Sequence, residues 1–555
     1  MFYSRVLRIV RGFESQNGHS RLKVIALSIS VAGFLAACGQ PGAISSGTTS
    51  SGAMVTTLPH ETTVPSIPTT TTATTVPVEP PGNASTRFNI GTPTVNTLWV
   101  DPSSGNDARA GTTRATALRT LSEAWNRVPA HPSVGIQINL VAGSYPVTSI
   151  PNYWEAKHGT LAAPIWLRAA DGAGTAILAG NVNVFNVSYL YFDGVSVNNS
   201  GDAFHCEQCD HVLLRHLTLD GQNVAQETLK VNQSRFMYVE DSIVTGAWDN
   251  AIDFVAVQDG QIVGNQVTHA GDWCAYAKGG SARILVEGNT FAHCGTGGFT
   301  AGQGTGFEFM TTPWIHYEAY DIRVVNNIVH DTEGAGLGVN GGFRILLAFN
   351  TLYRVGSRSH AIEVVQGSRG CDGDVAACQT RRDLGGWGTN DAGGQWIPSR
   401  SVYIYGNVVL NPAGFQSQWS HFDIHGSVVP PVASGVPSPS RVDDDLRIVD
   451  NIFSNGPATL DLGLGADACS PGNLTCTETL LRSENRLNTL VFSLINPSGG
   501  NYCVVSTGLP IVRPIPEFPV GPALTPSPGA APWQNAVTTT FSGSTRAASS
   551  IPGAC

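Results

Sequence analysis

A short phrase recurs through the middle of the chain and constrains its fold more than any other feature. The phrase is an apolar run, then Asn or Asp, one further residue and an apolar residue, as in "QIVGNQV", "ILVEGNTF" and "ILLAFNTL". Its marker residues are Asp241, Asn265, Asn289, Asn327, Asn350, Asn407 and Asn451, and Gly194 and His216 continue the register upstream. The spacing is about 23 residues wherever no longer segment is inserted. A repeat of this length is typical of a solenoid, in which each unit packs only on its neighbours.

Each repeat contains two or three short runs of period two separated by Gly or Asn turns, which predicts strands rather than helices. We therefore predict an all-β chain folded as a right-handed parallel β-helix, with Asn side chains forming a hydrogen-bonded ladder at one bend. A leucine-rich repeat would show its Leu spacing, and a propeller would need units nearly twice as long. Charged residues make up only 13% of the chain, which also argues against a helical, Lys/Glu-rich protein.

The segment before the repeats predicts a cap for the open end of the solenoid. After an initial strand, residues 98–128 become amphipathic around Leu118, Leu121, Ala124 and Trp125, which predicts a short helix. We predict an N-terminal cap and first coils over 83–190, the β-helix with inserted loops over 191–465, and a C-terminal cap with an irregular, disulfide-tied tail over 466–555.

Three long insertions, after Gln303, Gln366 and Asn411, bring tryptophans close to the repeats. These residues are Trp314, Trp387, Trp396 and Trp419. Aromatic side chains in such loops either stack on sugar rings in a groove or pack the loops themselves, and the sequence leaves both possibilities open.

The N-terminus has the pattern of an export signal. Basic residues precede the apolar run "VIALSISVAGFLAA", which is too short to span a bilayer. The run ends in "LAAC", which resembles the lipobox of bacterial lipoproteins and predicts a signal peptide over 1–37 and lipidation of Cys38; a signal peptide with a chance cysteine is the alternative. Residues 38–82, rich in Thr, Ser and Pro, are expected to form a tether. We expect an exported monomer, lipid-anchored to the outer face of the bacterial cell membrane or secreted, that meets the membrane only through its anchor.

The cysteine count agrees with an oxidising compartment. Of the 11 cysteines, ten remain once Cys38 is set aside, an even number. Sequence proximity suggests the pairs Cys206–Cys209, Cys371–Cys378, Cys469–Cys476, Cys274–Cys294 and Cys503–Cys555, although spacing alone leaves the connectivity open.

The formal net charge of −10 argues against nucleic acid as a partner, because no basic stripe accompanies it. An acidic polysaccharide would have to be held by local Lys or Arg side chains or by a bridging cation.

Polar residues recur at one place in the coil when they are counted from the markers. Within one residue of slack they are Lys230, Asp253, Lys278, Gln303, Asn340 and Glu363. Such a column should face outward, and adjacent coils about 4.8 Å apart would bring Asp253 and Lys278 within interaction range. The outward face of any solenoid strand is polar, but a mixture of acids and bases favours a functional surface over a decorative one.

One coil resembles a known family. The stretch "WDNAIDF" resembles the Asp-Asp-x-x-Asp signature of family nine pectate lyases, which are right-handed β-helices. The resemblance implies that Asp249, Asn250 and Asp253 bind calcium, with Glu227 as a further acid, and that Lys278 in "YAKGG" abstracts the proton next to a uronate carboxylate. Asn250 departs from the family's pattern, although an amide oxygen can also bind calcium.

The wider stretch from Leu98 to Gly465, with "APIWLRAADGAGTAILAG", resembles secreted β-helix proteins, among them polysaccharide lyases. The chemistry of β-elimination requires a neutralised substrate carboxylate and a base that works near neutrality. Asp272 is a possible additional ligand. Arg283 and Arg358 are candidates for gripping substrate carboxylates, or they pair with surface acids.

Two other functions remain open. A glycoside hydrolase on the same fold would use an acid cluster such as Asp249, Asp253 and Asp272. The coils show no Gly-His-Gly or Arg-x-Lys motif of the polygalacturonase type, and we interpret "DDD" at Asp443–Asp445 as a solvated acidic turn. A non-catalytic surface protein that binds glycans would show the same repeat, cap and tether. The sequence therefore predicts a polysaccharide-active surface protein, and in its sharpest form a calcium-assisted polyuronate lyase.

Overall fold

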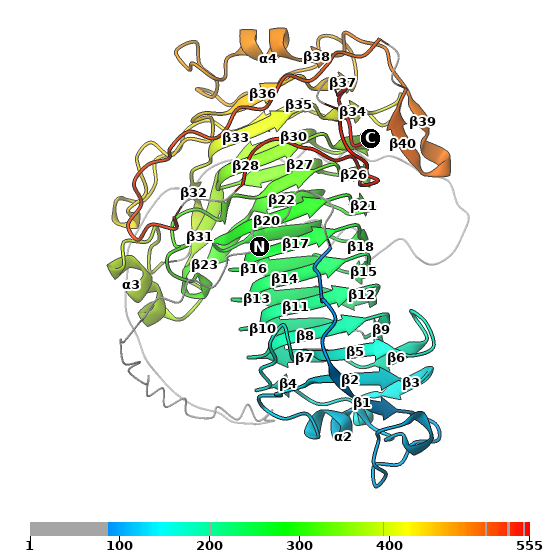
Figure 1. The fold of residues 1–555 in the computed structure, drawn as a ribbon. Coiled ribbons are helices and arrows are strands. Elements are labelled where there is room, and N and C mark those ends of the chain that lie inside the picture. The colour runs from blue at the N-terminus through cyan, green and yellow to red at the C-terminus, as the bar shows by residue number, and fades with distance from the viewer. Residues whose placement is uncertain (1–86, 200, 392, 506–507, 530–532, 548–549) are drawn as a thin grey trace, which may run out of the picture. The chain divides into compact units, whose positions relative to one another are not determined.

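The computed structural model describes residues 87–555, except 200, 392, 506–507, 530–532 and 548–549. The predicted signal peptide, Cys38 and the tether over 38–82 lie outside the described residues. Within them, three long parallel sheets wind into a right-handed parallel β-helix, which confirms the predicted fold (Figure 1). Each coil contributes one strand to sheet A, then one to sheet B, then one to sheet C.

Sheet A consists of β1 (Val95–Val100), β2 (Gly135–Leu140), β5 (Ile165–Ala169), β8 (Ser188–Asp193), β11 (Asp210–Arg215), β14 (Arg235–Glu240), β17 (Gln258–Val263), β20 (Ser281–Glu287), β24 (Ala319–Tyr320), β25 (Arg323–Val325), β28 (Gly342–Ala348), β33 (Arg400–Tyr405) and β36 (Arg447–Val449). Sheet B consists of β3 (Gly143–Pro146), β6 (Ala176–Ala179), β9 (Val195–Asn198), β12 (Thr218–Ala225), β15 (Ile243–Ala247), β18 (Gln266–Ala270), β21 (Thr290–Ala292), β26 (Ile328–Thr332), β29 (Thr351–Val355), β34 (Val408–Leu410), β37 (Ile452–Ser454) and β38 (Arg486–Leu487). Sheet C consists of β4 (Trp154–Glu155), β7 (Val182–Phe185), β10 (Phe204–Glu207), β13 (Leu229–Asn232), β16 (Ile252–Val255), β19 (Trp273–Lys278), β22 (Gly297–Gly302), β27 (Ala335–Asn340), β30 (His360–Val365) and β35 (Ser420–Ile424).

Two small sheets and a few helices complete the described part. A loop layer contains β23 (Gly304–Gly306), β31 (Gly367–Gly370) and β32 (Gly394–Ile397), and a hairpin near the C-terminus contains β39 (Leu494–Asn496) and β40 (Asn501–Val504). The α-helices are α2 (Leu121–Asn126), α3 (Val375–Asp383) and α4 (Glu478–Glu484), and the short 3-10 helices are η1 (Arg114–Thr116), η2 (Val147–Ser149), η3 (Phe307–Phe309), η4 (Val432–Ser434) and η5 (Pro497–Gly499). None of the helices in the described residues is long and apolar enough to cross a membrane.

The interior is filled by columns of side chains that occupy the same register position in successive coils. On sheet C, the inward column is Phe204, Leu229, Ile252, Ala275, Phe299, Leu337, Ile362 and Phe422, each directly beside the next. All are almost fully buried. Alternate side chains therefore point into a continuous core while their neighbours point outward, as period-two patterning requires.

The predicted asparagine ladder is present and forms one edge of this core. From Asn265 onward, the side-chain Nδ2 of each ladder residue donates to Oδ1 of the next at 2.9–3.0 Å, through Asn289, Asn327, Asn350, Asn407, Asn451 and Asn485. The same Oδ1 atoms accept backbone N–H groups of the preceding coil. The ladder and β38 thus continue the stack beyond the predicted boundary at 465.

The first three markers lie one residue out of this register. Ser242, not Asp241, occupies the ladder position, because its backbone N–H donates to Asn265 Oδ1 at 2.9 Å. Gly194, His216 and Asp241 precede that position and have positive φ values of 72°, 55° and 48°. They form the tight bend itself, where Gly is favoured and Asn, Asp and His are the next most tolerated residues.

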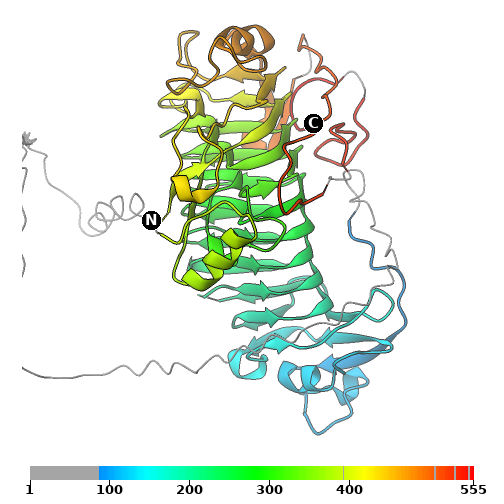
Figure 2. The same cartoon turned by 90° about the vertical axis from the view of Figure 1, so that its left-hand side faces the viewer.

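Both ends of the described chain cover the outer face of sheet A. Phe88 stacks on Tyr238 with ring centroids 4.3 Å apart, and Arg87 pairs with Asp241 at 2.6 Å. At the other end, Arg546 donates to Asn326 Oδ1 at 2.7 Å, across 220 residues of sequence. Figure 1 shows the N-terminal segment and the C-terminal tail running over this face, and Figure 2 shows α3 and its loops on another flank. The outward face of sheet C is therefore the better place for a binding surface.

The predicted helix and disulfides are observed. In α2, Leu121, Ala124 and Trp125 are buried against the first coils, and Thr120 caps the helix by accepting from Glu123 N–H at 3.1 Å. All five cysteine pairs suggested by spacing are disulfide-bonded: Cys206–Cys209, Cys274–Cys294, Cys371–Cys378, Cys469–Cys476 and Cys503–Cys555.

The loop tryptophans divide between the two roles considered for them. Trp314, Trp387 and Trp396 are buried together in one cluster and pack the loops. Trp419 is 60% exposed, so it alone of the four presents its ring to solvent.

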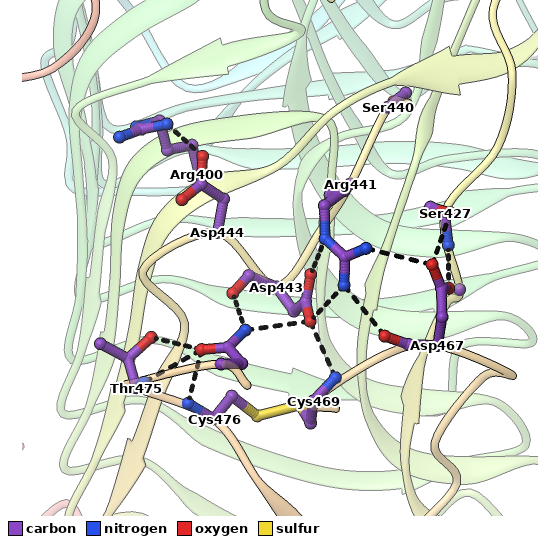
Figure 3. A network of polar contacts seen from close by, with 12 residues as sticks. Arg400, Ser427, Ser440, Arg441, Asp443, Asp444, Asp467, Cys469, Thr475 and Cys476 are labelled. Carbon is purple, nitrogen blue, oxygen red and sulfur yellow. Dashed lines mark hydrogen bonds and ion pairs between the residues drawn. A yellow bond between two sulfur atoms is a disulfide. The ribbon is translucent and has the colours of Figure 1, made fainter. Parts of the chain in front are cut away.

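The interpretation of "DDD" as a solvated turn is wrong for Asp443. This side chain is buried and accepts from the backbone N–H of Cys469 at 2.8 Å and from Asn473 Nδ2 at 3.0 Å. Arg441 donates both to Asp443 at 2.9 Å and to Asp467 at 3.0 Å (Figure 3). The network fastens the loop before β36 to the Cys469–Cys476 loop, because a buried carboxylate needs such partners.

The ladder predicts that removing a single asparagine side chain lowers the stability of the fold by a large amount. We expect Asn327→Ala to destabilise the fold by on the order of 3 kcal/mol, because it leaves several buried donors and acceptors of Asn289 and Asn350 unpaired. Urea unfolding followed by circular dichroism measures the difference. Asn152→Ala, at an exposed position, is the matched control. An Asn327→Ala midpoint equal to that of the control would contradict the role assigned to the ladder.

Candidate functional site

The predicted polar column resolves into two columns on the outward face of sheet C. Lys230, Asp253 and Glu363 share the first column, in which Tyr276 lies directly beside Asp253. Lys278 lies two residues further along its strand, beside Val255, and Asn340 occupies the corresponding place on β27. Gln303 follows the end of β22. The single column predicted from counting is therefore wrong. One cause is an irregularity in β12, between Asp220 and Ala225, that lengthens the coil before Lys230.

Lys230 is held between two carboxylates. Its Nζ lies 3.3 Å from Glu227 Oε2 and 3.7 Å from Asp253 Oδ2. Burial by itself lowers the pKa of Lys230, but the charges of Asp253 and Glu227 outweigh burial and raise it. This lysine therefore stays protonated.

Lys278 has different surroundings. Its Nζ donates to Gln303 Oε1 at 3.1 Å and lies 4.3 Å from the centroid of the Tyr276 ring. Gln303 Nε2 in turn approaches Asp272 Oδ2 at 3.5 Å. Among the described residues no carboxylate forms an ion pair with Lys278, whereas Lys230 has two. The ammonium is thus held by an amide and an aromatic face and is partly exposed.

Asp249 and Asp272 occupy the turns that lead into β16 and β19, one coil apart. The backbone N–H of Asp272 donates to the Asp249 carbonyl at 2.8 Å, so the two turns stack. Burial raises the pKa of Asp249, with the Asp253 charge adding to it and Lys278 opposing it. Burial likewise raises the pKa of Asp272 to about 6. The positive charge of Lys278 lowers the pKa of both carboxyls and so opposes the effect of burial.

Asn250 has a structural role in the same turn. Its Oδ1 accepts from the backbone N–H of Trp273 at 3.1 Å, and its Nδ2 donates to Asp249 Oδ1 at 3.1 Å. The side chain is buried, and its oxygen already has a donor. Asn250 therefore orients Asp249 and links two coils.

Glu227 and Tyr276 complete the buried part of the site. Burial, and after it the negative charge of Asp253, raises the pKa of Glu227 to about 7. Burial and the charges of Asp253, Glu227 and Asp249 raise the pKa of Tyr276 well above its ordinary value. The site therefore contains a carboxyl that keeps its proton close to neutrality, a state that acid–base catalysis exploits.

The outward polar residues of sheet C, from Lys230 to Asp423, form a strip, and its C-terminal end carries three residues that the sequence analysis did not predict: His360, Asp423 and His425. Glu363 Oε2 lies 3.0 Å from His360 Nε2, and Asp423 Oδ2 lies 3.4 Å from His425 Nε2 and 3.8 Å from His360 Nδ1. The hydrogen bond with Asp423 raises the pKa of His425. The exposed Trp419 lies beside His360, with ring centroids 6.3 Å apart. The alternation in "SHFDIHG" was the available signal, but the insertion after Asn411 hides its register.

Three residues that were predicted to bind substrate make other contacts instead. Arg283 forms a bidentate pair with Asp259 at 2.5 Å on sheet A, and Arg358 pairs with Glu333 at 2.9 Å. Asn340 is buried and its Oδ1 accepts from Thr300 Oγ1 at 2.7 Å. The two arginines therefore follow the alternative of pairing with surface acids.

The carboxylates provide a partial fit for a cation. Asp253 Oδ1 is buried and has no hydrogen-bond partner among the described residues. Glu227, Asp249 and Asp272 have raised pKa values to which neighbouring acids contribute, and a bound cation would relieve this repulsion. Lys230 already lies between Glu227 and Asp253, and the Asn250 oxygen is held within the turn by the backbone N–H of Trp273. The candidate ligands therefore narrow to Asp249, Asp253 and Asp272, which are spread over two coils and do not form one of the groups of described residues whose ligand atoms all lie within 4.8 Å of one another.

The raised pKa of Glu227 predicts a pH dependence of stability. Its folded-state pKa of about 7 exceeds the ordinary 4.5, so the folded protein binds the proton more tightly than the unfolded chain. This contribution is complete below about pH 4.5 and is lost as the pH rises toward 7. We expect Glu227→Gln to gain on the order of 2 kcal/mol over the wild type between pH 4.5 and pH 8.

Urea unfolding at the two pH values measures this change. Glu155→Gln, at an exposed position, is the control and should show no such trend. A difference between Glu227→Gln and wild type that is the same at both pH values would show that Glu227 titrates normally.

Comparison with known proteins finds similar folds. No family model and no curated protein matches the sequence. Similar solved structures include a pectate lyase Pel9A (16% identity, covering 78% of this chain and 96% of that one, TM-score 0.41). A rhamnogalacturonan lyase (13%, 64% and 87%, 0.41) and the A-module of the mannuronan C-5 epimerase AlgE4 of Azotobacter vinelandii (11%, 58% and 90%, 0.33) are also similar. At such low identities and TM-scores, these similarities do not assign a function.

Proposed function

We propose that the chain is a polysaccharide-active surface protein that cleaves an acidic polysaccharide by β-elimination, with Lys278 as the base. The observation that carries the proposal is the contrast between the two lysines of the strip. Lys230 is held by Glu227 and Asp253, whereas Lys278 has only an amide and an aromatic ring as partners among the described residues. A base must give up its own proton before it can accept one, and a carboxylate partner would oppose that.

The reaction uses few groups. The neutral Nζ of Lys278 takes the proton at C5 of a uronate, the electron pair forms the C4–C5 double bond, and the C4–O bond breaks. The departing oxygen takes a proton from water. Gln303, on the next coil, accepts a hydrogen bond from Nζ, and the Tyr276 ring lies against Nζ on the same strand. Trp419, at the far end of the strip, offers a face on which a sugar ring would stack.

Calcium belongs to the same proposal. Asp249, Asp253 and Asp272 would hold the ion, and bound calcium would supply positive charge toward the substrate carboxylate. Oxygen ligands suit calcium, and the unpartnered Oδ1 of Asp253 supports this assignment.

A glycoside hydrolase is the second candidate, and the protonation of Glu227 favours it. A carboxyl with a pKa of about 7 is a suitable general acid, and ionised Asp253 or Asp249 in the same strip would serve as base or nucleophile. Export and anchoring through Cys38 are part of the proposal for either activity, as they are for a protein that only binds glycans.

The decisive test of the base is substitution of Lys278. The domain from about Asn83 onward, incubated with a panel of polyuronates and calcium, should produce a near-ultraviolet absorbance from the unsaturated product. We expect Lys278→Ala and Lys278→Arg to lower kcat/KM by at least about 100-fold, because general-base catalysis contributes that much. Lys157→Ala, on the N-terminal cap, is the matched control and should retain activity.

The outcome also separates the alternatives. Reducing ends that increase without the absorbance would identify a hydrolase, and Glu227→Gln would then lose activity. Binding without either product would identify a glycan-binding protein. Full elimination activity in Lys278→Ala would exclude Lys278 as the base.

Removal of calcium gives a separate prediction. Chelator should abolish elimination and added calcium should restore it, and Asp249→Asn should raise the calcium concentration needed by about tenfold or more, because a ligand charge is lost. Calorimetric titration with calcium measures binding directly. Equal calcium affinity in Asp249→Asn and wild type would contradict the assigned ligand set.

A further inference from the structure

Three histidines recur at one place on sheet B, away from the strip on sheet C. His269 and His293 each lie four residues after a ladder asparagine, and His330 lies three residues after Asn327. His269 lies in β18, His293 directly follows β21, and His330 lies in β26, and these three strands are consecutive neighbours in the sheet. The ring centroids of His269 and His293 lie 5.2 Å apart, and those of His293 and His330 lie 5.5 Å apart. The coil spacing thus brings three imidazoles together, with His330 one residue out of the register of the other two, in register with Ala292.

A carboxylate joins these imidazoles. Asp331 follows His330, and one donor atom from each of His293, His330 and Asp331 lies within 4.8 Å of the other two. His293 is exposed, and His330 and Asp331 are partly buried. Two imidazole nitrogens and a carboxylate oxygen at this separation need only small side-chain rotations to meet one ion at bond lengths of about 2.0–2.2 Å.

His330 is oriented before any ion arrives. Its Nδ1 lies 2.7 Å from Asp331 Oδ2, and its ring stacks on Tyr502 with centroids 4.7 Å apart. Tyr502 belongs to β40, which the Cys503–Cys555 disulfide ties to the end of the chain. Because Asp331 is itself a member of the cluster, an ion bound by both residues would replace this hydrogen bond, and the contact with Tyr502 would keep the His330 ring in place.

We propose that His293, His330 and Asp331 form a binding site for a divalent transition-metal ion such as Zn²⁺. Imidazole nitrogen with a single carboxylate suits Zn²⁺, Cu²⁺ and Ni²⁺ rather than Ca²⁺ or Mg²⁺, which prefer oxygen ligands. His269, one coil further, lies outside this group, with its ring centroid 5.2 Å from that of His293. The site does not depend on the proposed activity, because it lies on another sheet and shares no residue with the strip.

The ion would link two neighbouring coils that are separated in the sequence by a long insertion. β21 and β26 are neighbours in the sheet although a 35-residue segment separates them, including the insertion that carries Trp314. Because the bound ion contacts the folded arrangement only, it would stabilise the fold by mass action.

Arg354 lowers the affinity of the site for a metal ion, so replacing Arg354 should have the opposite effect from replacing a ligand. Its Nη2 lies 2.5 Å from Asp331 Oδ1, so the guanidinium competes with an ion for the carboxylate charge. Removing this cation while keeping a polar side chain, as in Arg354→Gln, should tighten metal binding.

The experiment is calorimetric titration of Zn²⁺ into chelator-treated, untagged protein, with thermal unfolding in parallel. We expect one equivalent to bind and to raise Tm. His293→Ala and His330→Ala should weaken binding at least tenfold, and Arg354→Gln should strengthen it several-fold. His216→Ala, at an exposed bend after β11, should leave it unchanged.

Two outcomes would overturn the proposal. One is the absence of Zn²⁺ binding at 100 µM by wild-type protein whose circular dichroism is that of a folded chain. The other is binding that both His293→Ala and His330→Ala retain in full. Because Tm without metal is recorded for every variant, a loss of folding is distinguished from a loss of ligands.

Discussion

The fold depends on one constraint, which is that every coil must return to the same place after three strands. The asparagine ladder enforces this return, because each Oδ1 accepts two donors from the preceding coil and each Nδ2 donates to the following one and to the backbone. Buried amides cannot be left unpaired, so a coil that slipped by one residue would lose every one of these bonds. Insertions are therefore tolerated only between ladder positions. Asn350 and Asn407, which are 57 positions apart in the sequence, make the same hydrogen bond as the ladder residues of the shortest coil.

This constraint also explains how the strip on sheet C is built. The stack fixes the outward positions along each strand, and the turns add side chains such as Asp249 and Asp272 beside them. Charges that are far apart in sequence are then brought together without any dedicated scaffold. The charged groups of this surface therefore differ in their partners. Lys230 lies between two carboxylates, Lys278 contacts an amide and an aromatic ring, and His360 and Asp423 belong to an imidazole–carboxylate cluster.

The sequence contains enough information for the fold but not for the site. Period-two runs and recurrent asparagines report the backbone path directly, and the disulfide partners lie close in sequence or at the chain's end. Side-chain neighbours on sheet C depend instead on the length of each turn. The irregularity in β12 moved Lys230 relative to Lys278, and the insertion after Asn411 concealed Asp423 and His425. The pairing of Arg283 could not be predicted either, since its partner Asp259 lies on the neighbouring strand β17, one coil away in the sequence.

The covered face of sheet A has a consequence for the order in which the protein forms. The outward side chains of Leu285, Leu346, Tyr403 and Tyr405 are buried by the tail, with Val512 in the same cluster and Phe518 packed against it. A chain that is synthesised from its N-terminus presents these apolar groups to water until its last 50 or so residues follow. The β-helix can wind during synthesis, but the apolar face of sheet A stays exposed until the tail packs on it and Cys555 pairs with Cys503. The protein therefore completes this face last.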